Sequence, residues 1–335
     1  MQPTNAPTTG GPVAETALQK AAATALRAPS IFNTQPWRWE LRGQTMELWA
    51  DRSRQLNATD PTGRMLTISC GVALDHALVA LAADGHNPTV DRLPAEDTPD
   101  LLARITLTAE SIPPDNALRL LAAISKRHTD RRPFDETPVP DAVVERLRTI
   151  AEARDVYLAE LGGDRMVRFQ VTAARAGELD EDDPAYQVEL AEWTHRPAQS
   201  GDGVTRSSAV PAGPRKIPLR SFFPDGGEAL LPGPGHDGGA RYLALWTVDD
   251  GPAEWLAAGE SMSAILLEAT AEGLGVSPMT DIIEIPASRA LVHRLLDNLG
   301  EAQVALRIGV PTTASPAPAT PRRSRDDVVT VTQPT

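Results

Sequence analysis

Two runs of basic residues hold the groups best suited to binding an anion. One run, Lys126-Arg127-His128-Thr129-Asp130-Arg131-Arg132, stands just before Pro133, and the other, Arg322-Arg323-Ser324-Arg325, stands near the C-terminus. Guanidinium groups with hydroxyls beside them suit a phosphate group. The alternative is a solvated helix end and a charged tail, because runs of like charge are usually solvated.

A third candidate is the polar loop in the sequence APSIFNTQPW, residues 28–37. It contains a serine, an asparagine, a threonine and a glutamine, whose hydroxyl and amide groups can hold a heteroaromatic ring. The alternative is a turn after the preceding helix, which Pro29 and Pro36 would explain by themselves. The residues alone leave both interpretations open.

Several other chemistries lack their motifs. No GxSxG is present and no GxGxxG follows a predicted strand, so the sequence favours neither a hydrolase of that type nor a Rossmann nicotinamide domain. The six histidines lack metal-ligand spacing, and we expect no metal. The one cysteine, Cys70, excludes an intrachain disulfide framework and a multi-cysteine zinc site.

Composition indicates a globular protein of one large domain or two fused ones. The 335 residues are 41% hydrophobic and 23% charged. A net charge of −13 argues against a general nucleic-acid binder and against an anionic membrane surface as partner. We expect no apolar run to reach the about 18 residues of a membrane helix. The N-terminus lacks the features of a signal peptide, so a soluble, cytoplasmic protein is expected.

Hydrophobic periodicity predicts helices mixed with strands. A helix over 13–28 would end at Pro29, and alternating apolar residues predict a hairpin over 37–48. The helix expected at 66–84 is apolar on nearly every face, which is typical of a buried helix. The other expected elements are strands at 103–108, 156–161, 242–248 and 303–309 and helices at 116–125, 141–153, 164–179, 253–274 and 286–299.

The chain contains signs of an internal repeat. Gly71 and Gly259 lie 188 residues apart, as do Gly85 and Gly273. One Ala-rich segment runs from Gly71 to Gly85 and a similar one from Gly259 to Gly273. A proline and a later apolar strand with a central arginine follow both helices. The joint match predicts a duplication whose halves meet near residues 110–120. A covalent pseudo-dimer is its natural product.

Residues 180–240 carry much of the proline and glycine and predict only a short helix near 186–193. A stretch of this length is usually a functional lid or disordered. It contains Tyr186, Trp193, Phe222 and Phe223, which a disordered linker would usually lack. We therefore predict an ordered lid. The alternative is a peripheral ornament, which would cost little in loop closure.

Three motifs resemble the nitroreductase-like, FMN-binding family. APSxxNTQPW after a helix resembles its first signature, KRHTDRRPFDETPVPDAVVERL resembles its phosphate-binding motif, and RIGVP…RRSRDDV resembles its C-terminal end. Here the loop precedes the phosphate motif. That order, together with DxxGRxxxISCGVAL at 60–74, resembles the duplicated, pseudo-dimeric actinobacterial subgroup related to the Acg proteins.

The resemblance implies an α+β, nitroreductase-like fold. Two fused halves would form an intramolecular pseudo-dimer with antiparallel-type sheets flanked by helices. A flexible tail would occupy 1–12, the first half 13–115, and the second half 116–330 with the lid at about 180–240.

The resemblance also implies which residues bind the flavin. The first half would supply Pro29, Ser30, Asn33 and Gln35. The second half would supply Arg127, Thr129 and Arg131 for the phosphate, Pro278, Thr280 and Asp281 near flavin N5, and the C-terminal pair Arg323 and Arg325. The reverse site lacks both motifs, so one FMN per chain is expected. Phe32 stands where the subgroup commonly has histidine.

By this resemblance the chain would be an FMN-dependent oxidoreductase. Relatives take hydride from NAD(P)H and pass electrons by ping-pong turnover to nitro, quinone or related acceptors, with the chemistry at flavin N5 and no catalytic side chain. Two alternatives remain open: a protein that stores or shields FMN under the lid, and an interaction protein without cofactor. Intact Arg127, Arg131, Arg323 and Asn33 argue against the second. A small-molecule acceptor and a monomer are expected.

Overall fold

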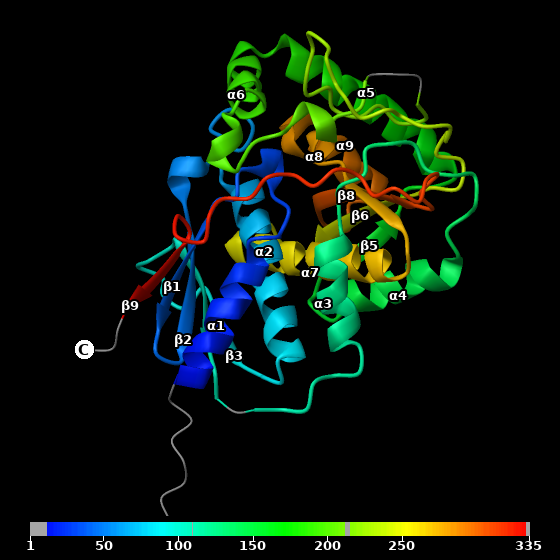
Figure 1. Ribbon diagram of the computed structural model, residues 1–335. Coiled ribbons are helices and arrows are strands. Elements are labelled where there is room, and N and C mark those ends of the chain that lie inside the picture. Colours follow the sequence, from blue (N-terminus) through cyan, green and yellow to red (C-terminus); the bar gives the residue numbers. More distant parts are fainter. Residues whose placement is uncertain (1–11, 109, 212–214, 333–335) are drawn as a thin grey trace, which may run out of the picture.

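Two β-sheets lie on either side of a central pair of long helices. The computed structural model describes residues 12–108, 110–211 and 215–332. The central helices are α2 (Arg64–Ala83) and α7 (Pro252–Ala271), and α1 (Pro12–Ala25) packs against α2 (Figure 1). The predicted α+β class is therefore confirmed. The tail predicted at 1–12 lies outside the described residues except for Pro12, where α1 begins.

The first sheet begins with the predicted hairpin. Strands β1 (Trp37–Arg42) and β2 (Thr45–Ala50) pair antiparallel across a turn at Gly43 and Gln44. β4 (Leu101–Thr106) and β3 (Thr89–Arg92) continue the sheet from β2. The last strand, β9 (Val329–Thr332), comes from the C-terminus and pairs parallel with β1, so the order is β3-β4-β2-β1-β9.

The second sheet repeats this arrangement. It contains β5 (Tyr157–Glu160), β6 (Arg241–Thr247), β7 (Gly275–Pro278) and β8 (Glu301–Gly309) in the order β5-β6-β8-β7. Matching β5–β8 to β1–β4 in chain order gives the same strand order and the same antiparallel pairings. The register also shifts in the same place, after Leu48 in β2 and after Leu245 in β6. β9 has no counterpart in the second sheet.

The two glycines that start the predicted repeat meet where α2 and α7 cross. A Cβ on Gly259 would overlap the carbonyl oxygen of Ile68 and lie 2.8 Å from the Cα of Gly71. A Cβ on Gly71 would overlap the carbonyl oxygen of Leu256 and lie 3.0 Å from the Cα of Gly259. Only glycine at both positions allows the two backbones to approach this closely.

Helix α2 corrects one expectation from composition. By length and hydropathy alone it is sufficient to cross a membrane, contrary to the prediction that no segment would be. However, 83% of its apolar window is buried inside the protein. This burial is what a core helix shows, and it agrees with the apolar pattern on nearly every face.

The connection between β5 and β6 is residues 161–240, here called the insertion. It contains α5 (Asp164–Asp182) and α6 (Pro184–Thr194), followed by mostly irregular chain. Tyr186, Trp193, Phe222 and Phe223 are buried in the same core cluster as residues of α1 and α2. The insertion therefore packs into the main core through its aromatic residues.

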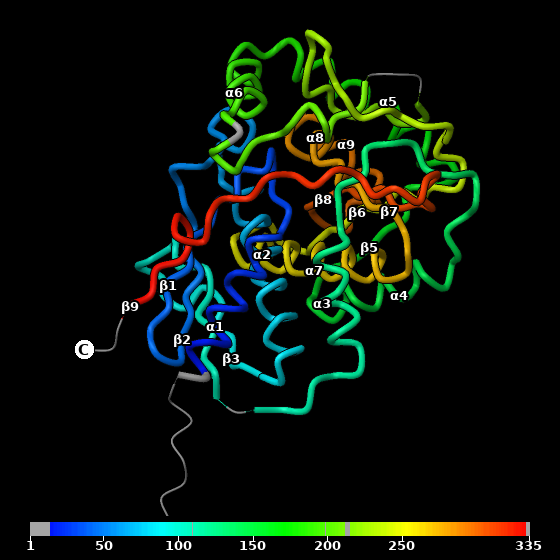
Figure 2. The backbone as a smooth tube through the Cα atoms, viewed as in Figure 1, coloured from blue at the N-terminus to red at the C-terminus, as the bar shows by residue number. Residues whose placement is uncertain are grey.

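The chain after β8 runs back across the molecule. Residues 310–328, here called the C-terminal arm, lead from the second sheet to β9 in the first (Figure 2). The sequence patterns did not predict β9, β3, β7 or the short helix α8 (Asp281–Glu284). The remaining helices, all expected, are α3 (Ala117–Lys126), α4 (Asp141–Glu152) and α9 (Pro286–Leu295).

Candidate flavin-binding site

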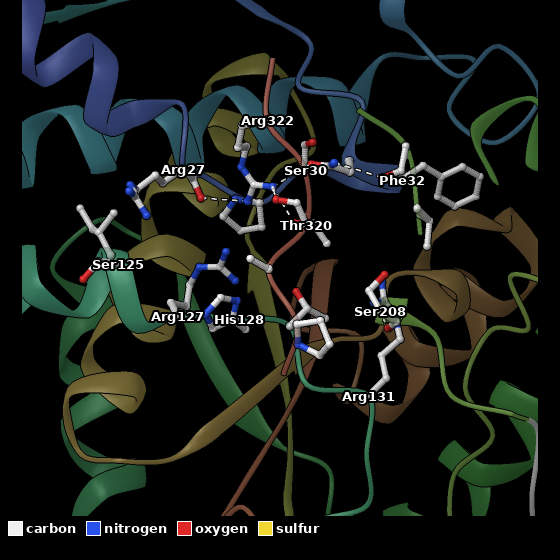
Figure 3. Close-up of a pocket in the computed structure, with 18 residues that line it drawn as sticks. Arg27, Ser30, Phe32, Ser125, Arg127, His128, Arg131, Ser208, Thr320 and Arg322 are labelled. Carbon is white, nitrogen blue, oxygen red and sulfur yellow. Dashed lines mark hydrogen bonds between the residues drawn. The ribbon is translucent and has the colours of Figure 1, made fainter. Parts of the chain in front are cut away.

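Two neighbouring pockets lie where the loop before β1, the segment after α3, the insertion and the C-terminal arm meet (Figure 3). We call them the basic pocket and the adjoining pocket. The polar residues that line the basic pocket are Arg27, Ser30, Asn33, Ser125, Arg127, His128, Thr129, Arg131, Ser208, Thr320 and Arg322. Both pockets share Pro29, Ser30, Phe32, Thr129 and Arg131.

The basic pocket concentrates positive charge in an acidic protein. Four arginines line it, and none of its lining residues is an aspartate or glutamate. Arg127 and Arg322 reach it from opposite sides, one from the end of α3 and one from the C-terminal arm (Figure 3). Such a carboxylate-free group of guanidinium donors is suited to a phosphate.

Arg127 is the clearest sign that an anion belongs here. Its side chain is buried, and its Nε and Nη1 atoms have no hydrogen-bond partner among the described residues. Burial, together with the positive charge of Arg322, lowers the pKa of Arg127 to about 9. A buried cation without a counter-ion is costly, so an anion in the pocket would relieve that cost.

The segment after α3 is held along the edge of the second sheet. The backbone nitrogen of Asp130 donates to the carbonyl oxygen of Val276 at 2.9 Å, and Thr129 forms a parallel bridge with the same residue. Arg131 donates from Nη1 to the carbonyl oxygen of Ser208 at 2.9 Å. Burial lowers the pKa of Arg131 to about 10. This pairing fixes Thr129 and Arg131 beside β7 and the residues that follow it.

The loop before β1 has an unusual backbone. Phe32, Asn33 and Gln35 all have positive φ, at 46°, 55° and 50°. The Ser30 hydroxyl accepts from the Gln35 backbone nitrogen at 2.8 Å and closes the loop. Three positive φ angles within four residues store strain, which the surrounding structure must hold in place.

The insertion and the C-terminal arm provide that support. The Asn33 side chain donates to the carbonyl oxygens of Gly203 and Pro321, both at 3.1 Å, and accepts from Arg322 at 3.2 Å. Gln35, which is fully buried, donates to the carbonyl oxygen of Gly201 at 2.8 Å. Asn33 therefore lines the basic pocket with its side chain already engaged, and Gln35 lines neither pocket.

The C-terminal basic run faces the pocket through a different residue from the two predicted. Arg323 donates to the carbonyl oxygens of Gln35 and Asp327, Arg325 is exposed, and neither residue lines either of the two pockets. Arg322 lines the basic pocket and donates to the Thr320 hydroxyl at 2.6 Å. In so short a run, the sequence cannot show which arginine faces inward.

Comparison with known proteins decides the family. The model described as "Nitroreductase family" matches residues 124–310. The chain is 37% identical over 315 residues to "Putative NAD(P)H nitroreductase acg" of Mycobacterium tuberculosis, covering 93% of this chain and 94% of that protein. It is 39% identical over 313 residues to "Putative NAD(P)H nitroreductase Rv3131" of the same species, covering 91% and 88%. The chain belongs to the nitroreductase family.

Among solved structures, "FMN and NADPH-dependent nitroreductase NfnB" from Sphigopyxis sp. strain HMH is 20% identical with a TM-score of 0.41. The alignment covers 63% of this chain and 97% of that one.

The adjoining pocket collects the other predicted residues of this nitroreductase-family chain. Pro278, Thr280 and Asp281 line it together with Ser277 and Met279. Asp281 is buried, and that burial raises its pKa. The remaining lining is largely apolar and comes from α2, α7 and the insertion: Met65, Ile68, Met262, Leu219 and Phe222.

Arg220 of the insertion is a residue that sequence reasoning missed. It lines the adjoining pocket, pairs with the Glu284 carboxylate of α8, and lies with its guanidinium carbon 4.8 Å from the centre of the Phe32 ring. The neighbouring carboxylates outweigh burial and raise its pKa. An isolated arginine in a Pro-rich stretch carries no motif, so only the fold reveals its position.

Proposed function

We propose that this chain is an FMN-dependent oxidoreductase that accepts hydride from NAD(P)H and reduces a small nitro, quinone or related acceptor. Family membership supports an oxidoreductase. The observation that carries the cofactor assignment is Arg127, a buried cation without a partner in a carboxylate-free pocket.

The residues present fit FMN in two parts. Arg127, Arg131, Arg322 and Thr129 would hold the phosphate in the basic pocket. Pro29, Ser30 and the Ser277–Asp281 stretch would hold the ring system in the adjoining pocket, where Met65 and Met262 exclude water. Bound FMN would supply the redox chemistry, since its N5 accepts and donates hydride. The protein would bind and orient the cofactor and exclude water from its ring system.

We further propose one FMN per chain in a monomeric, cytoplasmic protein. The halves would be residues 13–115 and 116–330, which is supported by the shared strand order and by the meeting of Gly71 with Gly259. The first half would supply the loop at 29–36 and the second the basic segment at 127–131. An internal pseudo-dimer would replace the interface that two separate subunits would otherwise form.

Changing Arg127 tests the cofactor assignment. Arg127→Ala should weaken FMN binding by roughly tenfold to hundredfold, because a charge-assisted contact is lost, and leave riboflavin binding unchanged. Arg148→Ala, on the surface of α4, is the control. Binding is measured by flavin fluorescence. Equal losses for FMN and riboflavin would place Arg127 away from the phosphate.

Turnover is tested on the purified protein under anaerobic conditions. The wild-type protein should show flavin absorbance that bleaches when NADPH or NADH is added. A protein that is colourless and cannot bind added FMN would contradict the proposal. Mass analysis of the released cofactor should give about one FMN per chain, and light scattering should give a monomer.

One structural feature favours the second candidate, a protein that stores or shields FMN. The insertion lines both pockets, through Gly203, Val204 and Ser208 in one and Leu219, Arg220 and Phe222 in the other. A flavin beneath it would be shielded from large donors. Flavin that stays oxidised with NADPH and NADH but is bleached by dithionite would identify that function.

A further inference from the structure

A third pocket lies in the insertion and shares Arg131 with the basic pocket. We call it the arginine pocket, because Arg131, Arg215 and Arg220 line it. The other described residues that line it all belong to the insertion: Ala209, Val210, Pro211, Pro218, Leu219, Ser221 and Phe222. It shares Leu219, Arg220 and Phe222 with the adjoining pocket, so the two lie side by side.

The arginine pocket has an uncompensated positive charge. None of its lining residues is acidic. Arg220 is neutralised by Glu284 of α8, with Asp180 3.9 Å away. In contrast, Arg131 donates to a carbonyl oxygen, and neither Arg131 nor Arg215 forms an ion pair with a carboxylate in the described part of the chain. Asp130 attracts both arginines and Asp237 attracts Arg215, but these carboxylates pair with Arg132 and Arg307 instead.

Arg215 shows the same sign of a missing partner as Arg127. Its Nη1 atom is buried and has no hydrogen-bond partner among residues 12–108, 110–211 and 215–332. Burial lowers the pKa of Arg215, and the charge of Arg307 lowers it further. A guanidinium in such surroundings is stabilised by an oxyanion that accepts its unused donors.

This position is separate from the one proposed for the FMN phosphate. Arg215 does not line the basic pocket, and neither Arg127 nor Arg322 lines the arginine pocket. Only Arg131 lines both, and its guanidinium carbon lies 4.7 Å from the centre of the Phe222 ring. Phe222 in turn lines the adjoining pocket, where the flavin ring and the molecule that reacts with it are proposed to meet.

We propose that the arginine pocket binds a carboxylate or phosphate group of the electron donor or acceptor, while the reacting part of that molecule lies in the adjoining pocket. The inference rests on the proposed function and narrows its substrate class to anions. Arg215 would provide specificity and would take no part in electron transfer. Paired guanidinium groups suit the two oxygens of a carboxylate or phosphate.

The test compares pairs of molecules that differ by one anionic group. With the flavin-loaded protein, 4-nitrobenzoate is compared with 4-nitrobenzamide as acceptor, and NADPH with NADH as donor. Arg215→Ala should raise KM about tenfold or more for the member of one pair that carries the additional anionic group, and leave KM for the other member unchanged. The pair in which KM changes shows whether the anionic group belongs to the electron acceptor or to the electron donor. Arg215→Lys should restore part of the preference.

Arg206→Ala is the matched control. Arg206 lies in the same insertion, stacks its guanidinium 4.5 Å from the Phe223 ring centre, and lines none of the three pockets. Arg206→Ala should change neither the KM ratio of 4-nitrobenzoate to 4-nitrobenzamide nor that of NADPH to NADH. The inference is overturned if Arg215→Ala leaves the KM ratios of 4-nitrobenzoate to 4-nitrobenzamide and of NADPH to NADH both unaltered, or if it raises KM equally for the two members of each pair.

A binding measurement separates this inference from the proposed function. Titration of the oxidised, flavin-loaded protein with 4-nitrobenzoate or 4-nitrobenzamide, followed by the change in flavin absorbance, needs no turnover. If no donor reduces the flavin, the proposed function fails. The arginine pocket is still supported if Arg215→Ala selectively weakens 4-nitrobenzoate, and it is rejected if the affinity does not change.

Discussion

The matching strands β4 and β8 of the two sheets each contain an arginine, Arg104 and Arg307, and the two arginines lie in opposite environments. Arg104 on β4 donates from Nε to Glu47 on the neighbouring strand at 2.9 Å, and its side chain is 40% exposed. Arg307 on β8 is 1% exposed, and both oxygens of Asp237 accept from its Nη1 at 2.8 Å. Glu47 belongs to the first sheet itself, whereas Asp237 belongs to the insertion.

The difference shows that the end of the insertion stabilises the second sheet, because Asp237 pairs with the buried Arg307 of β8. A buried guanidinium must be paired, and no residue of β5 to β8 pairs with Arg307. Its Nη2 also donates to the carbonyl oxygens of Asp130 and Arg132, at 2.8 and 3.0 Å. The last residues of the insertion thus hold Arg307, and Arg307 holds the segment that presents Arg131. The first sheet needs no such support.

Isosteric changes at the two acidic partners should show the largest contrast. Asp237→Asn should lower the free energy of unfolding by about 3 kcal/mol or more, because it leaves a buried charge without a counter-ion. Glu47→Gln should cost less than about 1 kcal/mol, since that pair is partly exposed. Urea unfolding measures both. Equal effects would remove the distinction between the two sheets.

The contact between α2 and α7 should be weakened by a substitution at either of its two glycines, Gly71 and Gly259. Gly259→Ala and Gly71→Ala should each cost about 2–3 kcal/mol, because either methyl group overlaps a carbonyl oxygen of the other helix. Gly177→Ala on α5, where nothing lies within 4 Å, should be neutral or slightly stabilising. Thermal unfolding measures all three. A tolerant Gly71 beside an intolerant Gly259 would contradict a symmetric crossing.

Removing Gln35 should have a smaller effect. Gln35→Ala leaves the Gly201 carbonyl oxygen and the Arg323 backbone nitrogen without their buried partner, which should cost about 1–2 kcal/mol. The insertion should then be cleaved faster in limited proteolysis. Gln19→Ala on α1 removes only a bond within one helix and should cost a few tenths of a kcal/mol at most. If proteolysis is unchanged, the loop does not anchor the insertion.

The smallest expected effect concerns pH. Burial raises the pKa of Asp180 in the insertion to about 7, compared with about 3.9 for an unfolded chain. Between those values the folded state binds a proton that the unfolded state lacks, so this group lowers stability as pH rises from about 4 to 7.

Asp180→Asn should therefore be more stable than the wild type at pH 8, by on the order of 1 kcal/mol, because water partly screens the charge. The gain should shrink toward pH 4. Arg220, Glu284, Asp281 and Tyr186 face Asp180 and stay unchanged in both proteins, so the difference isolates one carboxyl group. Exposed Asp182→Asn is the control. A gain that does not vary with pH would contradict the assignment.

Local patterns predicted most of the fold. The apolar helices at 64–83 and 252–271 and the alternating hairpin at 37–50 are set by residues near one another in sequence. β9 was missed because four residues in a Pro- and Thr-rich tail form a strand only against β1, at the other end of the chain. β3 and β7 are as short, and their pairing likewise depends on distant partners.

The site was predictable to the extent that its residues form contiguous motifs. Pro29, Ser30, Arg127, Thr129 and Arg131 line the basic pocket together, and their role in binding flavin stays a prediction. Arg220 and Arg215 lie in no motif and reach their pockets only through the path of the insertion. The direction of a side chain such as Gln35 depends on packing across the fold, which no pattern within the loop encodes.

The parallel pairing of β9 with β1 has a consequence for biosynthesis. The ribosome makes β1 long before β9, and the stretch that carries Arg322 to the basic pocket lies just before β9. A growing chain can form the hairpin and the central helices, but it cannot close the basic pocket until Arg322 has been synthesised. Products that terminate before Arg322 should therefore be unable to retain FMN, so that cofactor loading reports synthesis through the C-terminal arm.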